Sequence, residues 1–225
     1  MHFQFVLFDG FDPLDIIAPF EVIAAASDFA HDDDAVIEMV SSGEPPRPFV
    51  SGTRGLTISA TSQLDPTLPG YIFVPGASGL VEGDPDDGVE TVPVIIARAA
   101  QTVMIPPIQQ ALTEPGVTVT TVCGGSLILA MAGILEGRTA TTHVLGLDVL
   151  DAAGVNMLDA RVVVDGDLIS GGGVTSGLDV ALFVVEQHYG PVIAHKVEVL
   201  FQYERRGTTL YAPTPTATPA ATAAA

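Results

Sequence analysis

The single cysteine, Cys123, stands at the most distinctive turn of the sequence. It follows the β-branched run Val-Thr-Val-Thr-Thr-Val and precedes Gly124, Gly125 and an apolar helical pattern. A nucleophile at such a strand-to-helix turn projects from the sheet, and small neighbours are needed because the backbone there is strained. The dipole and free amides of the following helix would favour a thiolate and could stabilise an oxyanion. Cys123 is therefore the candidate nucleophile, with a buried structural thiol as the alternative.

Two other residues have side chains that could assist a thiol. Asp15 lies in Pro-Leu-Asp-Ile-Ile-Ala-Pro, at the start of an otherwise apolar helix. It is either a helix cap or a carboxyl group that shares a proton with Cys123 and acts as general acid or base. His143 ends Arg-Thr-Ala-Thr-Thr-His, twenty residues beyond the cysteine. A distant Cys–His pair is usual in nucleophilic catalysis, although His143 could equally be a satisfied polar residue under a loop.

The elements that position these residues alternate between short apolar runs and helical patterns. The runs predict strands at 2–8, 35–40, 71–74, 117–122, 161–164 and 168–170, with a short extended piece at 56–60 and a turn at Asp165-Gly166. The helical patterns cover 13–26 (kinked at Pro19), 92–111 (interrupted at Pro106-Pro107), 124–134, 144–153, 174–188 and 192–203. Apolar strands separated by helices predict an α/β domain with a mainly parallel sheet covered on both faces.

In such a sheet, sites form at the carboxyl ends of the strands. That rule selects four segments, at 9–15, 75–79, 123–126 and 171–175. The domain is expected to span 1–211, and the Ala/Thr/Pro tail 212–225 is expected to be disordered because it has nothing large to bury.

The amino-acid composition limits which partners and cofactors the protein is expected to bind. A net charge of −19 repels phosphate backbones, so nucleic-acid binding is not expected. No apolar run is long enough to cross a membrane, and a single cysteine cannot form an intrachain disulfide, so a cytoplasmic location is expected. Acidic excess with Lys196 as the only lysine also suits concentrated salt, and a halophilic source is a hypothesis on equal footing with a merely acidic protein. The histidines form no ligand pairs, and the turn at 9–12 is not glycine-rich, so neither a metal nor a nucleotide cofactor is expected.

The motifs together resemble the ThiJ/PfpI superfamily. The matching stretches are the opening Phe-Asp-Gly-Phe-Asp-Pro-Leu-Asp, Val-Pro-Gly-Ala-Ser-Gly at 74–79, Val-Cys-Gly-Gly-Ser at 122–126, Gly-Arg-Thr-Ala-Thr-Thr-His at 137–143, and Gly-Gly-Gly-Val-Thr-Ser-Gly-Leu-Asp at 171–179. The resemblance runs from about residue 3 to residue 205. It implies a flavodoxin-like three-layer α/β/α sandwich, related to class I glutamine amidotransferases. It also implies a homodimer, Cys123 as the reactive centre, Asp15 and His143 beside it, and Gly76, Ala77 and Gly124 binding the substrate or an oxyanion.

Within the superfamily, the motifs are most similar to isonitrile hydratases and to the sensor domains of certain transcription regulators. The Ala/Thr/Pro ending favours a stand-alone domain of hydratase type. The resemblance then implies that Cys123 attacks an isonitrile carbon while Asp15 handles protons, and that water releases an N-substituted formamide. This sequence departs from the hydratases at Gly124, where they carry threonine, at Val144, and in additional residues at 104–115.

Two alternatives stay open. Glyoxalase or deglycase chemistry on reactive aldehydes is found in other branches, which usually carry glutamate where this sequence has Asp15. A non-enzymatic redox sensor, in which Cys123 is oxidised to a sulfinic acid, would also use a reactive thiolate.

Overall fold

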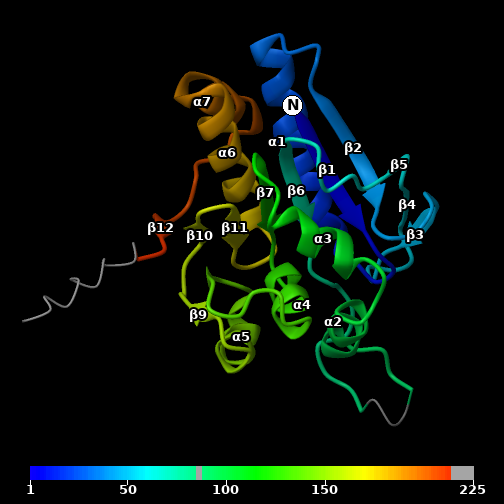
Figure 1. Cartoon of the computed structure of the whole chain (residues 1–225). Coiled ribbons are helices and arrows are strands. Elements are labelled where there is room, and N and C mark those ends of the chain that lie inside the picture. Colours follow the sequence, from blue (N-terminus) through cyan, green and yellow to red (C-terminus); the bar gives the residue numbers. More distant parts are fainter. Residues whose placement is uncertain (85–87, 214–225) are drawn as a thin grey trace, which may run out of the picture.

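A mainly parallel sheet of eight strands forms the centre of the molecule (Figure 1). The computed structural model describes residues 1–84 and 88–213. The strand order is β12-β10-β11-β7-β6-β1-β2-β5, and β10 with β11 is the antiparallel pair. These strands are β1 (His2–Leu7), β2 (Val36–Ser41), β5 (Ser62–Gln63), β6 (Gly70–Val74), β7 (Val117–Thr121), β10 (Val162–Asp165), β11 (Leu168–Gly171) and β12 (Thr209–Tyr211). Two small pairs accompany the sheet: β3 (Pro48–Val50) with β4 (Thr57–Ser59), and β8 (Thr139–Ala140) with β9 (Asn156–Met157).

Helices cover both faces of the sheet. On one face α1 (Pro13–Ala30), α6 (Ser176–Tyr189) and α7 (Pro191–Phe201) pack against one another. On the other lie α2 (Val92–Ala99), α3 (Ile105–Ala111), α4 (Gly125–Met131) and α5 (Leu147–Ala152), with a short 3-10 turn η2 (Val144–Gly146) before α5 (Figure 1). This is the flavodoxin-like three-layer α/β/α architecture that the sequence predicted.

The core is apolar on both sides of the sheet because all but one residue in each of the central strands β1, β6 and β7 is buried. Phe5 and Phe73 stack at a centroid distance of 4.5 Å on neighbouring strands, and Ile72 and Val119 are fully buried beside them. Helices α1 and α6 pack closely at Gly177, because a Cβ added to this residue would lie 3.2 Å from Pro19. The rigid sheet is what holds the loops at its carboxyl edge in place.

The helical segment predicted over 92–111 is interrupted, but not at Pro106-Pro107 as predicted. The chain leaves the helix at 100–104, and Pro106-Pro107 lies in the first turn of α3. Proline is tolerated there because the first amides of a helix have no partner within the helix. The predicted helix over 144–153 begins with the η2 turn, and the strands β3, β5, β8, β9 and β12 were not predicted. The predicted hairpin at 161–170 is confirmed.

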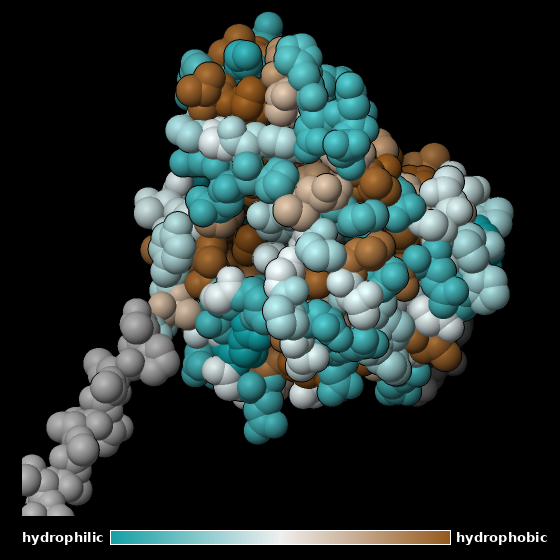
Figure 2. All heavy atoms as spheres, turned by 45° about the horizontal axis from the view of Figure 1, so that its top comes forward, coloured by the Kyte–Doolittle hydropathy of each residue, from teal (hydrophilic) through white to brown (hydrophobic). Residues whose placement is uncertain are grey.

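The face in Figure 2 is mostly hydrophilic, with separate hydrophobic groups between the polar ones. The predicted tail 212–225 lies outside the described residues from 214 onward. The amide of Ala212 donates to the carbonyl of Val164 at 2.8 Å, so residue 212 is attached to the sheet through β10.

Candidate functional site

Four loops meet at one edge of the sheet. They follow β1, β6, β7 and β11, which are neighbours in the order β11-β7-β6-β1 and run parallel. The arrowhead of β1 points toward the end of the molecule where α2 and α4 lie (Figure 1). Asp12, Ala77, Cys123 and Val174, one from each loop, line the same cavity. The edge that the strand pattern selected is therefore a real convergence of the four predicted segments.

Cys123 occupies a strained turn between β7 and α4. Its φ is +54°, a left-handed conformation that is uncommon for a residue with a side chain. Its amide donates to the carbonyl of Gly171 at 3.2 Å, and its own carbonyl accepts a 2.7 Å hydrogen bond from the Thr142 hydroxyl. The amide of Cys123 is thus held by β11, and its carbonyl is held by the 141–143 segment. The side chain is 7% exposed and lines the cavity.

Asp15 is fully buried in the first turn of α1, near enough to Cys123 to act electrostatically on its thiol. Its Oδ2 accepts a 2.9 Å hydrogen bond from the Gly76 amide, while its Oδ1 is buried without a hydrogen-bond partner among the described residues. A buried carboxylate oxygen without a donor is costly, which favours a proton on the group. Burial and, next, the nearby charge of Asp12 raise the pKa of Asp15 well above its usual value, and the opposing effect of the Gly76 hydrogen bond is outweighed.

Burial also raises the pKa of the Cys123 thiol, and the negative charge of Asp15 raises it further. The Gly124 amide acts in the opposite direction but is outweighed. The first amide of the following helix thus favours the thiolate, as expected, but burial and Asp15 outweigh it. The pattern correctly located the helix, but it did not reveal how little water reaches the sulfur. The pKa values of the Cys123 thiol and of the Asp15 carboxyl group are thus both raised.

The cavity over Cys123 has a volume of about 370 Å³ and is mainly apolar. Its walls include Val81, Val92, Ile96, Leu127, Met131 and Val149. Among the described residues that line it, three side chains can ionise: Asp12, Cys123 and His143. Small neutral molecules with an apolar body suit such a cavity.

His143 lies at the cavity wall but is not paired with the thiol. It is half-buried and precedes η2, where its Nδ1 accepts a 3.2 Å hydrogen bond from the Leu145 amide. Within the described part of the chain, no hydrogen bond joins His143 to Cys123. The neutral ring in this arrangement carries its proton on Nε2 and presents a donor.

The three backbone positions expected to bind substrate have different environments. Gly76 directs its amide to Asp15, and its carbonyl accepts from the Asp12 amide at 2.9 Å, so it holds the acid rather than lining the cavity. Ala77 is buried and lines the cavity. Gly124 also lines it, and its amide lies against both the sulfur and Gly76.

Close approach requires the glycine at position 76. A Cβ added there would lie 2.4 Å from the Gly124 nitrogen and 3.1 Å from Asp15 Oδ2. At Gly124, an added Cβ would lie 2.9 Å from the end of the Ile96 side chain. Ile96 thus occupies the space into which a larger residue after the cysteine would project.

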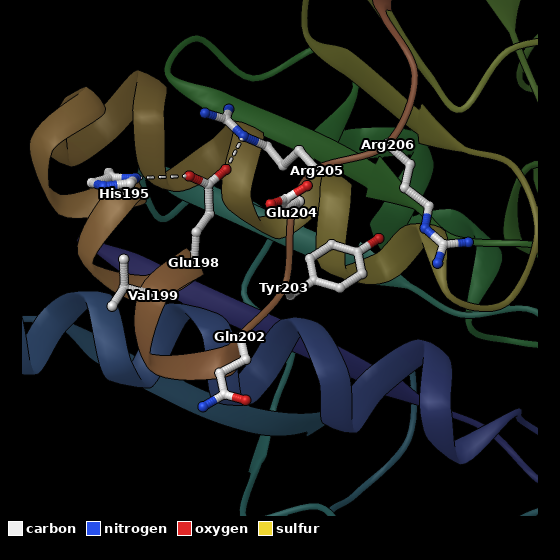
Figure 3. Close-up of a pocket in the computed structure, with 8 residues that line it drawn as sticks. All are labelled: His195, Glu198, Val199, Gln202, Tyr203, Glu204, Arg205 and Arg206. Carbon is white, nitrogen blue, oxygen red and sulfur yellow. Dashed lines mark hydrogen bonds and ion pairs between the residues drawn. The ribbon is translucent and has the colours of Figure 1, made fainter.

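A second and larger hollow, of about 650 Å³, lies at the end of α7 (Figure 3). Glu198 bonds both His195 and Arg205 there, and Arg205 also pairs with Glu186. No residue of the predicted site lines it. These ion pairs attach the segment after α7 to α6 and α7, which indicates a structural role for Arg205.

Within residues 1–84 and 88–213, no cluster of histidine, cysteine and acidic side chains could hold a metal ion. No helix in the same residues is long and apolar enough to cross a membrane.

The sequence missed the roles of three residues at the site. Asp12 appeared only as part of a loop, although an acidic residue before proline at a helix start signals a cap that faces the strand ends. Thr142 lay in a recognised motif without a role. Ile96 carried no signal, because its position over Gly124 depends on how α2 packs against α4.

Comparison with known proteins places this geometry in a family. A model of the DJ-1/PfpI family matches residues 97–187. The isonitrile hydratase of Pseudomonas putida is 32% identical over 201 residues, which are 88% of this chain and 77% of the hydratase. The chain belongs to the DJ-1/PfpI family. The expected superfamily is thereby confirmed.

Other DJ-1/PfpI relatives agree in fold. A crystal structure of a ThiJ/PfpI family protein from Pseudomonas syringae has a TM-score of 0.72 and 26% identity, covering 91% of this chain and 76% of that one. A deglycase from Thermococcus kodakarensis is 28% identical over 165 residues, 72% of this chain and 84% of the deglycase. The family thus includes relatives named for two different reactions.

Proposed function

We propose that this protein is a cysteine-dependent hydratase that adds water to an isonitrile and releases an N-substituted formamide. The observation that carries the proposal is that Cys123 lines an apolar cavity while the fully buried Asp15 lies behind it, near enough to act electrostatically on the thiol. The similarity to the isonitrile hydratase of Pseudomonas putida supports it.

The protonation of the pair suits an isonitrile. Isonitriles are neutral and carry one apolar substituent, so an apolar cavity can bind them without desolvating a charge. Their terminal carbon must receive both a nucleophile and a proton. A thiol and a carboxyl group whose pKa values are both raised can supply the nucleophile and the proton.

In the first step, the sulfur of Cys123 bonds to the isonitrile carbon. The thiol proton passes through Asp15 to that carbon, which leaves a thioimidate on the cysteine. Water then adds to the carbon while the nitrogen gains a proton. Finally the carbon–sulfur bond breaks, the hydroxyl of the adduct loses its proton to the sulfur, and the formamide leaves. The net change is the addition of one water molecule.

His143 and Gly124 have supporting roles in this proposal. His143 lines the cavity, and in this mechanism its Nε2–H donates to the substrate nitrogen. The Gly124 amide stabilises charge on the sulfur as the carbon–sulfur bond forms and breaks. This amide is present although the threonine hydroxyl of the hydratases is absent.

The test is formamide production from phenyl isonitrile, followed in buffer with multimolar salt. Wild type is compared with Cys123→Ser, which removes the nucleophile, and Asp15→Asn, which keeps an acceptor for Gly76 but removes the acid. Turnover in wild type that is lost in both variants would support the proposal. A folded wild-type protein that forms no formamide would overturn it.

A second candidate is deglycase or glyoxalase chemistry on a reactive aldehyde. The relative named a deglycase covers 72% of this chain, and a neutral thiol can add to an aldehyde carbon. Loss of methylglyoxal in the presence of wild type, but not of Cys123→Ser, would favour it. A redox-sensor function has less support because oxidants attack the thiolate, and the pKa of Cys123 is raised.

A further inference from the structure

The proposed reaction needs a base for the attacking water, and the cavity restricts which group can serve. Asp15 is fully buried and does not line the cavity. The sulfur of Cys123 is bonded to the substrate carbon at that stage. Two ionisable lining residues remain, Asp12 and His143.

His143 is unsuited to the task as the structure holds it. Its Nδ1 already accepts the Leu145 amide, so the neutral ring presents Nε2–H, which is a donor. The nearby hydroxyl of Ser78 is also engaged, since it donates to the Phe11 carbonyl and accepts from the Thr53 hydroxyl. Neither group offers a free basic atom to water in the cavity.

Asp12 lines the cavity and has acceptor capacity that the other groups lack. It caps α1 three residues before Asp15. Its Oδ1 accepts the Leu14 amide at 2.9 Å and its carboxyl group also accepts the Asp15 amide, which leaves part of the acceptor capacity of a carboxylate unused. Its backbone is fixed to Gly76, which lies against both Asp15 and Gly124. Its carboxyl group is near enough to act electrostatically on both Asp15 and Cys123.

We propose that Asp12 is a further catalytic residue of this site, which takes a proton from the water that attacks the carbon bound to Cys123. This inference rests on the proposed hydratase function. Asp12 returns that proton to the nitrogen as the carbon–oxygen bond forms. It then relays the hydroxyl proton of the adduct to the departing sulfur, so the carboxylate is regenerated in each cycle.

The test separates the two steps of the reaction. Asp12→Asn keeps the helix cap, because asparagine caps as well as aspartate, and removes only the carboxylate. The protein is mixed with phenyl isonitrile, and formamide is measured together with the intact mass of the protein. We expect turnover to fall by about 100-fold, in the range typical for loss of a general base. We also expect a Cys123 adduct, one isonitrile heavier, to accumulate in Asp12→Asn and not in wild type.

Controls distinguish this inference from the function on which it rests. Asp148→Asn changes an exposed acidic residue of α5 that does not line the cavity, and it should behave as wild type. Asp12→Ser, which also retains a capping oxygen, replaces Asp12→Asn should that variant not fold. Wild-type turnover in Asp12→Asn, or loss of turnover without an accumulated adduct, would overturn the role of Asp12 alone. Absence of both formamide and adduct in wild type would overturn the hydratase function, and the role of Asp12 with it.

Discussion

The hydroxyl of Thr142 donates a 2.7 Å hydrogen bond to the carbonyl of Cys123, the residue whose backbone has the left-handed φ of +54°. Thr142 is 2% exposed, so water does not replace this bond when it is lost. The 141–143 segment is therefore part of the support for the strained turn.

Thr142→Val should weaken both stability and activity. Valine fills the same volume but leaves a buried carbonyl without its donor, which costs about 1–3 kcal/mol. Urea unfolding measures the loss of stability, and kcat measures how far the change at the turn lowers the activity of Cys123. Thr142→Ser, which keeps the hydroxyl, is the matched control. Equal stability of the valine variant and wild type would show that the bond does not hold the turn.

Asp15→Asn should make Cys123 more reactive toward iodoacetamide. Burial is the main cause of the raised pKa of the thiol, and the charge of Asp15 is the next, so removal of that charge lowers the pKa. The pH midpoint of alkylation should therefore move downward in Asp15→Asn but stay above that of a free cysteine. Asp148→Asn should leave the midpoint unchanged. An upward movement in Asp15→Asn would contradict the electrostatic account.

Asp15 should also give stability a specific pH dependence. Its pKa is raised in the folded protein, so the folded state binds the proton more tightly than the unfolded state. The contribution is complete below the unfolded pKa near 4 and is lost as pH rises through the folded value. Urea unfolding at a series of pH values should show that Asp15→Asn becomes progressively more stable than wild type as pH increases. A stability difference independent of pH would rule this out.

The features of this site that could be predicted from the sequence depend on residues that are neighbours in the chain. The Cys123 turn, the Asp15 helix start and the convergence of four loops follow from runs of neighbouring residues and from the rule for parallel strands. The sign of the thiol pKa did not follow, because it depends on burial by elements distant in sequence. Likewise, the role of Gly76 is set by Asp15 and Gly124, 61 residues before it and 48 after it respectively. The five unpredicted strands are two or three residues long, and their pairing depends on tertiary neighbours more than on their own pattern.

Gly76→Ala should disrupt the site more than a glycine change at its rim. The added Cβ would lie 2.4 Å from the backbone nitrogen of Gly124, where no side chain can move aside. Overpacking of this kind costs about 1–3 kcal/mol, and displacement of Asp15 from Cys123 should lower kcat by roughly 100-fold. Gly173→Ala, whose new Cβ would meet its nearest neighbour at 3.7 Å, is the control and should retain activity. Similar kcat values for both variants would contradict the close-packing account.

The acidic surface predicts a response to salt. With a net charge of −19, self-repulsion opposes the folded state at low ionic strength and is screened as salt is added. We expect the Tm to rise on the order of 5–10 °C between 0.1 M and 2 M potassium chloride. Thermal unfolding followed by circular dichroism measures this. A Tm that does not change with salt would count against a halophilic source.

The order β11-β7-β6-β1 brings four segments, spread along the chain between residues 9 and 175, to one edge of the sheet. The segments that line the cavity are therefore synthesised at different times. The last of them, around Val174, comes after the antiparallel strands β10 and β11. Earlier fragments contain Asp15 and Cys123 but have no β11 to accept the Cys123 amide. Reactivity of this thiol with its substrate would thus report completion of the sheet, while nascent or truncated chains would leave a cysteine without its constrained geometry.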